Sequence, residues 1–187
     1  MDPTETVPPE EQQERLQKKG IFTTEAITIL APPETLYHLW MNPQNFQNLS
    51  DQLESVTKIS ETKTHWVWRA LKDRTRIEWD SEIVEKKENQ YIAWRSTLHE
   101  NLLISGRVEF DLLPYGRGTV VRVKLGYDVP IGKMAVLLEK VLGESPHRNL
   151  KLFLVRLRQF METGELARVE GQSAGNDRDK ETNTALH

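Results

Sequence analysis

The sequence predicts an α+β fold in which a curved, seven-stranded antiparallel sheet wraps around one long C-terminal helix. Two patterns carry this prediction: an amphipathic segment at 145–164 and a series of alternating segments before it. In the amphipathic segment, large apolar residues recur at steps of three and four and form one stripe, made of Leu150, Phe153, Leu154, Leu157, Phe160 and Met161. Such a stripe must be covered, and strands are the main elements that precede it. We therefore expect the helix to lie across a sheet.

Both ends of this helix carry recognisable signals. The Ser145 hydroxyl is suited to cap the first turn, and Pro146 suits the first helical position because the N–H it lacks would have no partner there. Gly164 favours the left-handed conformation that closes a helix. The helix is therefore expected to run from 146 to about 163.

The chain opens with a strand and two short helical segments. Residues 21–30 are rich in β-branched side chains, which is typical of a strand. Two prolines end it, because the residue before a proline avoids the helical region and prolines cannot pair in a sheet. A short helix is then expected at 33–42 and a helical turn at 43–50, with inward side chains at Leu36, Leu39, Trp40, Phe46 and Leu49.

Six further strands are expected at 53–60, 64–71, 74–87, 90–98, 101–113 and 119–129. Most alternate between apolar and polar residues, which predicts a meander with one buried and one solvated face. The expected inward residues are Trp66, Trp68, Ala70, Ile77, Trp79, Ser81, Ile83, Ile92, Trp94, Ser96, Leu98, Ile104, Gly106, Val108, Phe110, Leu112, Val121, Val123, Leu125 and Tyr127. In the first of these strands, Leu53, Val56 and Ile59 do not alternate cleanly.

Composition limits the possible functions. The chain has 187 residues and no cysteine, which excludes disulfides, thiolate metal sites and a cysteine nucleophile. The net charge of −3 lacks the basic excess of a nucleic-acid binder, so we expect no nucleic-acid partner. The sequence has no signal peptide and no run of apolar residues long enough to span a membrane, so a cytoplasmic protein is expected. Peripheral membrane contact and the oligomeric state stay open.

Three regions are expected along the chain. Residues 1–19 form a flexible N-terminal arm rich in Glu, Gln and Pro, and residues 165–187 form a disordered polar tail. Residues 20–164 form the folded domain. Within it, Lys133–Leu142 is expected to be a short helix or lid before the long helix, and Ile131–Leu142 could form a gate over a cavity entrance.

Several segments resemble one known superfamily. They are ITILAPPETLYHLWMNPQNF at 27–46, THW at 64–66, IEWDSEI at 77–83, IAWRS at 92–96, GRVEF at 106–110, GRGTVVRV at 116–123 and METG at 161–164. Together they are similar to the START-like (SRPBCC) helix-grip superfamily, in its polyketide cyclase/dehydrase and coenzyme-Q-binding branch of bacterial proteins. The resemblance covers about 21–164 and implies an apolar cavity between sheet and helix.

The expected ligand site is the aromatic interior of that cavity. Apolar ligand pockets are lined by aromatic side chains with a few polar groups that orient the guest. The candidate ligand-binding residues are Trp66, Trp68, Trp79, Ser81, Trp94, Ser96, Phe110, Tyr127, Phe153 and Leu157. Among them Ser81, Ser96 and Tyr127 supply the polar groups. The alternative is that the aromatics only fill the core.

No catalytic residue, metal site or cofactor is expected. The strand charges Arg69, Arg76, Glu78, Asp80, Glu82, Arg95, Arg107, Glu109 and Arg122 share the outward parity and are expected to form cross-strand ion pairs. Glu78 and Arg95 would be the best catalytic or ligand-anchoring candidates if either turned inward. The five histidines, His38, His65, His99, His147 and His187, show no metal-ligand spacing and are expected at the surface.

Three functions are compatible with these patterns. The first is a binding protein for a hydrophobic small molecule such as a lipid, a quinone or a polyketide-like compound. The second is a cyclase or dehydratase acting on a polyketide-like substrate in the same cavity. The third is a packed interaction or assembly module without a ligand. The interior distinguishes them, because a carrier needs apolar space and an enzyme needs buried polar groups as well.

Overall fold

The computed structural model describes residues 21–69, 76–96, 103–128 and 146–164. Seven antiparallel strands form one sheet in the order β1-β7-β6-β5-β4-β3-β2. The strands are β1 (Ile21–Ile29), β2 (Leu53–Lys58), β3 (Lys63–Arg69), β4 (Arg76–Lys87), β5 (Tyr91–Ser96), β6 (Leu103–Leu112) and β7 (Thr119–Asp128). The predicted α+β fold is thereby confirmed. The possible gate at 131–142, Ser145, both tails, and the inward positions Ala70 and Leu98 lie outside the described residues.

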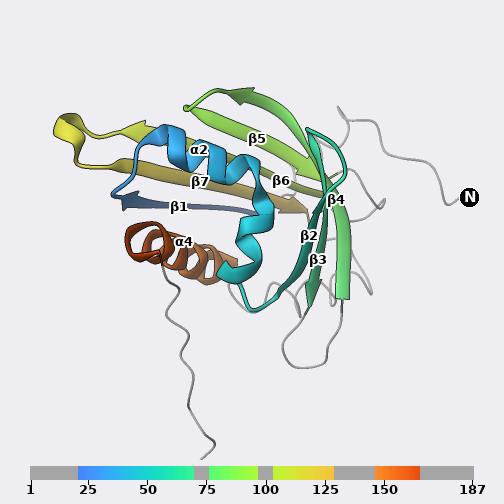
Figure 1. The fold of residues 1–187 in the computed structure, drawn as a ribbon. Coiled ribbons are helices and arrows are strands. Elements are labelled where there is room, and N and C mark those ends of the chain that lie inside the picture. The colour runs from blue at the N-terminus through green and yellow to red at the C-terminus, as the bar shows by residue number, and fades with distance from the viewer. Residues whose placement is uncertain (1–20, 70–75, 97–102, 129–145, 165–187) are drawn as a thin grey trace, which may run out of the picture.

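The sheet is strongly curved. In Figure 1, β2, β3 and β4 turn steeply away from the direction of β1, β7 and β6. The pairing register shifts between Leu53 and Ser55 on β2, and again between Ile83 and Glu85 on β4. Extra residues of this kind bend a strand and increase its local twist. The shift on β2 also explains why Leu53 and Val56 are both buried although they are three residues apart.

The helices cover only part of the concave face. They are α2 (Pro33–Met41), the 3-10 segment η1 (Pro43–Leu49) and α4 (Pro146–Thr163), while a further 3-10 turn, η2 (Pro114–Gly116), lies in the hairpin between β6 and β7. The helix α4 packs against β1 and η1, and α2 packs against β6. Figure 1 shows α4 beside β1 and away from β3 and β4. As predicted, Gly164 ends α4 with a φ of 72°, and its N–H donates to the Phe160 carbonyl at 2.9 Å.

The core lies where these helices meet the sheet. The α4 stripe contributes Leu150, Leu154 and Leu157 as buried residues, with Phe153, Phe160 and Met161 partly buried against them. The helix is also tied to η1, because the Arg156 guanidinium donates to the Leu49 carbonyl at 3.3 Å and to Asp51 at 2.8 Å. These contacts fix α4 over one half of the sheet.

Some expected core positions are different in the structure. Ile59 was counted among the apolar residues of the strand expected at 53–60 but is exposed, because β2 ends at Lys58 and the chain turns there. Leu112 was expected inside but is also exposed, because the end of β6 extends past the core. Conversely, Tyr37 and Leu103 are buried although neither was among the expected inward residues. In α2 the buried face is Leu36, Tyr37 and Trp40, and Leu39 is only partly buried.

We expect Leu157→Ala to destabilise the protein by about 2–5 kcal/mol, because it opens a cavity under α4. Leu157 is fully buried, whereas Leu152 on the same helix is 49% exposed. The matched control Leu152→Ala should change the free energy of unfolding by less than about 0.5 kcal/mol. Urea unfolding measures both. Equal losses in the two variants would mean that α4 does not bury this stripe.

Candidate functional site

A row of hydroxyl groups crosses the concave face of the sheet. Thr64 on β3 pairs with Ser81 on β4, and Ser81 pairs with Ser96 on β5. On β6 the next position is Ile104, whose N–H donates to Ser96 Oγ at 3.0 Å, and Ile104 in turn pairs with Tyr127 on β7. We call Thr64, Ser81, Ser96 and Tyr127 the hydroxyl row. Paired residues on neighbouring strands point to the same face, so the register brings these groups to one level.

Most of the hydroxyl row is buried. The exposed fractions are 6% for Ser81, 4% for Ser96 and 7% for Tyr127, and burial raises the pKa of the Tyr127 hydroxyl. Ser96 accepts from the Ile104 amide, and Thr64 Oγ1 accepts from Trp66 Nε1 at 2.8 Å. Within the part of the chain that the structure describes, the hydroxyls of Ser81 and Tyr127 form no hydrogen bond. Neither oxygen is among the fully buried side-chain atoms that lack a partner in the described residues, so both hydroxyls are accessible to solvent.

Three tryptophans adjoin the row on the same face. The rings of Trp66 and Trp79 are stacked with centroids 6.1 Å apart and planes 3° apart, and the Trp68 ring lies 6.1 Å from that of Trp79. We call Trp66, Trp68 and Trp79 the tryptophan trio. All three are only partly buried, and the buried Trp68 Nε1 has no hydrogen-bond partner among the described residues. The trio thus presents flat apolar surface that the packing of the described residues does not fully cover.

The remaining predicted site residues belong to the packed core. Trp94, Phe110 and Phe153 each lie 6.1–6.4 Å from the Trp40 ring, and Leu157 is fully buried. These four residues fill the space under α2 and α4. The ten predicted site residues therefore separate into two groups. Trp94, Phe110, Phe153 and Leu157 pack the core, whereas the tryptophan trio lies on the less covered part of the concave face and Ser81, Ser96 and Tyr127 are buried on the same face.

Gly106 sets the position of Trp94. A Cβ atom on Gly106 would lie 2.2 Å from the Trp94 ring, so the indole lies directly over the glycine backbone. This arrangement places an aromatic ring between the core and the hydroxyl row. A side chain at this position of β6 would push the ring away.

A carboxylate–histidine pair on the concave side was not found by sequence reasoning. Glu25 has the inward parity of β1, its side chain is 15% exposed, and its Oε1 lies 2.8 Å from His147 Nδ1 at the start of α4. Thr23 Oγ1 lies 3.3 Å from the same nitrogen. His147 was expected at the surface, and its side chain is 63% exposed. Its contact with Glu25 was not predicted. The only sequence signal was the parity of Glu25 with Ile27 and Ile29.

The outer face carries the charged side chains, as expected. Glu78 lies beside His65, and Arg95 stands opposite Glu82, so neither Glu78 nor Arg95 turns inward. Arg107 lies 3.8 Å above the Tyr91 ring centroid and donates to Glu109 at 2.9 Å. The hydrogen bond from Arg107 lowers the pKa of Glu109. The Tyr91 hydroxyl donates to Glu85, and this hydrogen bond raises the pKa of Tyr91.

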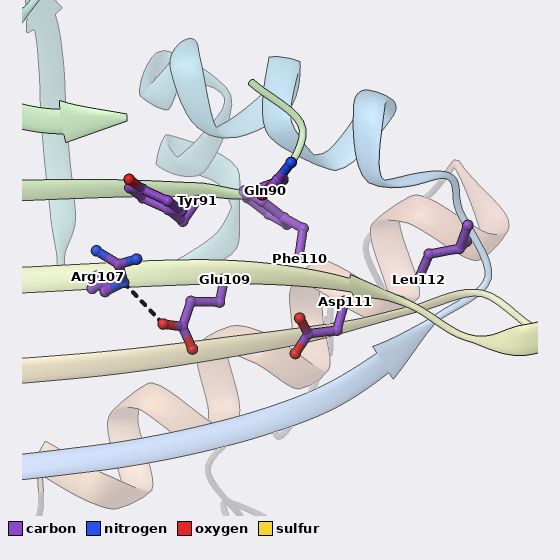
Figure 2. A pocket seen from close by; sticks show the side chains of 7 residues that line it. All are labelled: Gln90, Tyr91, Arg107, Glu109, Phe110, Asp111 and Leu112. Carbon is purple, nitrogen blue, oxygen red and sulfur yellow. Dashed lines mark hydrogen bonds and ion pairs between the residues drawn. The ribbon is translucent and has the colours of Figure 1, made fainter. Parts of the chain in front are cut away.

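A pocket of about 400 Å³ opens over this network (Figure 2). It is lined by Gln90, Tyr91, Arg107, Glu109, Phe110, Asp111 and Leu112. The charges in it already have partners: Arg107 binds Glu85 and Glu109, and Asp111 binds Arg122 at 3.0 Å. We therefore regard this pocket as part of a stabilising surface network and place the candidate site on the concave face.

The fold, with its partly covered aromatic face, defines a START-like domain. A START superfamily protein from Mycobacterium smegmatis aligns with a TM-score of 0.58 at 12% identity, covering 74% of this chain and 97% of that one. The protein DR_A0006 from Deinococcus radiodurans aligns with a TM-score of 0.60 at 28% identity, covering 78% of this chain and all (100%) of that one.

The family follows from the sequence match. The model of the family described as "Polyketide cyclase / dehydrase and lipid transport" matches residues 29–153. The chain belongs to this family. An uncharacterized 17.2 kDa protein from Streptomyces lincolnensis is 29% identical over 70 residues, which is 37% of this chain. The match spans 45% of that relative's length. No helix in the described residues is long and apolar enough to cross a membrane.

We expect Gly106→Ala to displace the Trp94 ring and to destabilise the protein by about 1–3 kcal/mol, the usual effect of overpacking. Urea unfolding followed by tryptophan fluorescence measures both changes. In a Trp94→Leu background the same glycine substitution should be less harmful, because the ring that collides with it is gone. An undiminished penalty in that background would show that Trp94 is not what Gly106 accommodates.

Proposed function

We propose that this protein binds a hydrophobic small molecule against the concave face of the sheet, beside the part that α4 covers. The tryptophan trio supplies apolar ring surface, and Ser81, Ser96 and Tyr127 supply polar contacts. Trp94, Phe110, Phe153 and Leu157 form the packed floor of the site. The observation that carries the proposal is the trio, because three neighbouring, partly exposed tryptophans on an inward face are costly unless something apolar covers them.

Membership of the family supports the same function. Its description combines cyclase or dehydrase activity with lipid transport, and both require a pocket for an apolar molecule. The free energy of binding would come mostly from burying apolar area, at about 25 cal/mol per Å². The polar groups would fix the orientation of the ligand.

The first test is whether the protein holds such a molecule. Native mass spectrometry of the purified protein should show an apolar adduct, and titration with decylubiquinone or palmitate should quench tryptophan fluorescence. Absence of both an adduct and any quenching would reject the binding function and favour a packed interaction module.

We expect Trp79→Leu to weaken binding of the quenching ligand about tenfold, since an aromatic contact contributes about 0.5–1.5 kcal/mol beyond its buried area. Isothermal calorimetry measures the affinity without relying on tryptophan fluorescence. The matched control is Tyr91→Leu, which removes an aromatic residue from the outer face and should leave the affinity unchanged. If both variants bound as tightly as the wild type, the ligand would lie elsewhere.

The pair of Glu25 and His147 favours a second function, a cyclase or dehydratase type of enzyme. A carboxylate that accepts from His147 Nδ1–H leaves Nε2 free to take a proton from a substrate. At 2.8 Å, Glu25 is in position to orient the imidazole in this way. Such a base would act on an acidic C–H or O–H of a molecule held on the concave face.

We expect this enzyme to accelerate deuterium exchange into the central carbon of dibenzoylmethane, an apolar 1,3-diketone, above the rate in buffer. His147→Gln and Glu25→Gln should both slow the exchange, by about 100-fold or more for the histidine. The exchange is followed by NMR, and binding of the diketone is measured in parallel. A wild-type rate equal to that of buffer would reject the enzymatic function and leave the binding function standing.

A further inference from the structure

We infer that the acidic N-terminal segment of this chain, residues 2–14, docks on the outer side of α4. Residues 1–19 were expected to form a flexible arm, and docking would hold the acidic part of that arm against the domain. The inference concerns the side of α4 that faces away from the sheet, so it does not depend on the proposed ligand binding.

The outer side of α4 combines exposed apolar and basic residues. Leu152 is 49% exposed and Val155 is 37% exposed, and Lys151 and Arg158 are exposed beside them. Side chains three or four positions apart are neighbours on a helix, so Val155 adjoins Leu152, Lys151 and Arg158. We call these four residues the basic face of α4.

The two cations of the basic face are not engaged by the rest of the described structure. The side chains of Lys151 and Arg158 form no ion pair or hydrogen bond with the described residues, whereas Arg156 on the same helix binds Asp51 at 2.8 Å. Among the 18 residues of α4 the only carboxylate is Glu162, which already accepts from the Leu30 N–H at 3.2 Å. Two such cations beside two exposed apolar residues form a surface that suits an acidic, partly apolar segment.

The N-terminal segment has the matching composition. Every charged side chain before position 15 is acidic, namely Asp2, Glu5, Glu10, Glu11 and Glu14. Val7, Pro8 and Pro9 lie among them and supply apolar contacts. The segment therefore complements the basic face in both charge and apolar character.

The other end of the chain is a poorer match. Residues 165–187 carry five acidic side chains, but these are interspersed with Arg168, Arg178 and Lys180. A segment of mixed charge is attracted to two cations less strongly than a segment of one sign. The charge pattern thus favours the N-terminal segment as the occupant.

The N-terminal segment is also within reach of the basic face. β1 begins at Ile21, and Thr23 Oγ1 lies 3.3 Å from His147 Nδ1, so the chain enters the domain beside the start of α4 (Figure 1). Arg158 lies about 17 Å further along the helix, at 1.5 Å per residue. The seven residues from Glu14 to Ile21 extend to about 24 Å. The acidic residues at 10–14 therefore reach both cations.

Docking of this kind is expected to be reversible and sensitive to salt. An exposed ion pair stabilises little on its own, and at 1 M salt charges are screened beyond about 3 Å. Burial of Leu152 and Val155 adds an apolar contribution, and attachment to the same chain raises the effective concentration of the segment at α4.

A paramagnetic label on the arm tests the inference. Because the chain has no cysteine, Gln12→Cys provides one attachment site for a nitroxide. In the full-length protein at low salt, the label should broaden the amide NMR signals of the basic face and leave those of β3 and β4 sharp. The broadening should decrease strongly in 1 M NaCl. Unbroadened signals across α4 at low salt would overturn the inference.

Charge reversal distinguishes docking from chance proximity of a tethered arm. Lys151→Glu combined with Arg158→Glu should abolish the broadening, and the further changes Glu10→Lys, Glu11→Lys and Glu14→Lys should restore it. The matched control is Lys86→Glu combined with Lys87→Glu, which makes the same change of charge at exposed positions of β4 and should leave the broadening intact. Equal broadening in the wild type and in the α4 double variant would show that the arm does not bind there.

Cleavage by a glutamate-specific protease gives a second readout without any label. A docked segment is cut in proportion to the population of its undocked state. The α4 double variant should therefore be cut within residues 10–14 about fivefold faster than the wild type, the effect of losing two exposed ion pairs. The β4 control should be cut at the wild-type rate. Equal rates in all three proteins would contradict the inference.

Two outcomes would assign the basic face to another occupant. A label attached through Ser173→Cys that broadened the basic face, when the label at position 12 did not, would identify residues 165–187 instead. Phosphatidylserine vesicles that broadened the same signals, with no effect of the arm label, would identify a membrane surface. Either result overturns the inference and leaves the proposed binding function untouched, because neither measurement involves the concave face.

Discussion

The apolar stripe of α4 constrains the rest of this structure. A single helix of 18 residues cannot cover a sheet of seven strands, so its stripe is buried over one half of the sheet only. That half contains β1 and the contacts with η1, and together with α2 it forms the packed core. The bends in β2 and β4 turn the other half of the sheet past the end of α4. The concave surface of β3 to β5 is the part that this packing leaves less covered, and it holds the residues with unsatisfied surface or polar groups.

The two faces of the sheet carry different kinds of side chains. Outward charges are paired with one another, as in the network of Arg107, Glu109 and Arg122. Pairs of this kind at the surface contribute little to stability, and their charges are already engaged when a ligand approaches. The inward face holds neutral polar groups among aromatic rings, with the contact between Glu25 and His147 at its margin. Recognition on this face is therefore expected to depend on shape and hydrogen bonding.

Local patterns predicted the elements well and the site only in part. Alternation placed Ser81, Ser96 and Tyr127 on the inward face because a strand repeats every two residues. It could not show that they share one level, because that depends on the register of five strands and on a bulge in β4. It also could not pair Glu25 with His147, which come from opposite ends of the domain. Leu112 was misplaced because alternation does not indicate where a strand leaves the core.

The position of β1 in the sheet affects how the chain can fold. β1 is synthesised before the other strands but pairs with β7. Ile21 therefore cannot pair with Tyr127 until β7 has been synthesised. Every other strand pairs with its neighbour in sequence and can form hairpins locally. Closing so long a loop slows folding, and during synthesis β1 remains an unpaired edge until almost the whole sheet has left the ribosome. The pairing of β1 with β7, which places β1 beside α4, is thus a late step of folding.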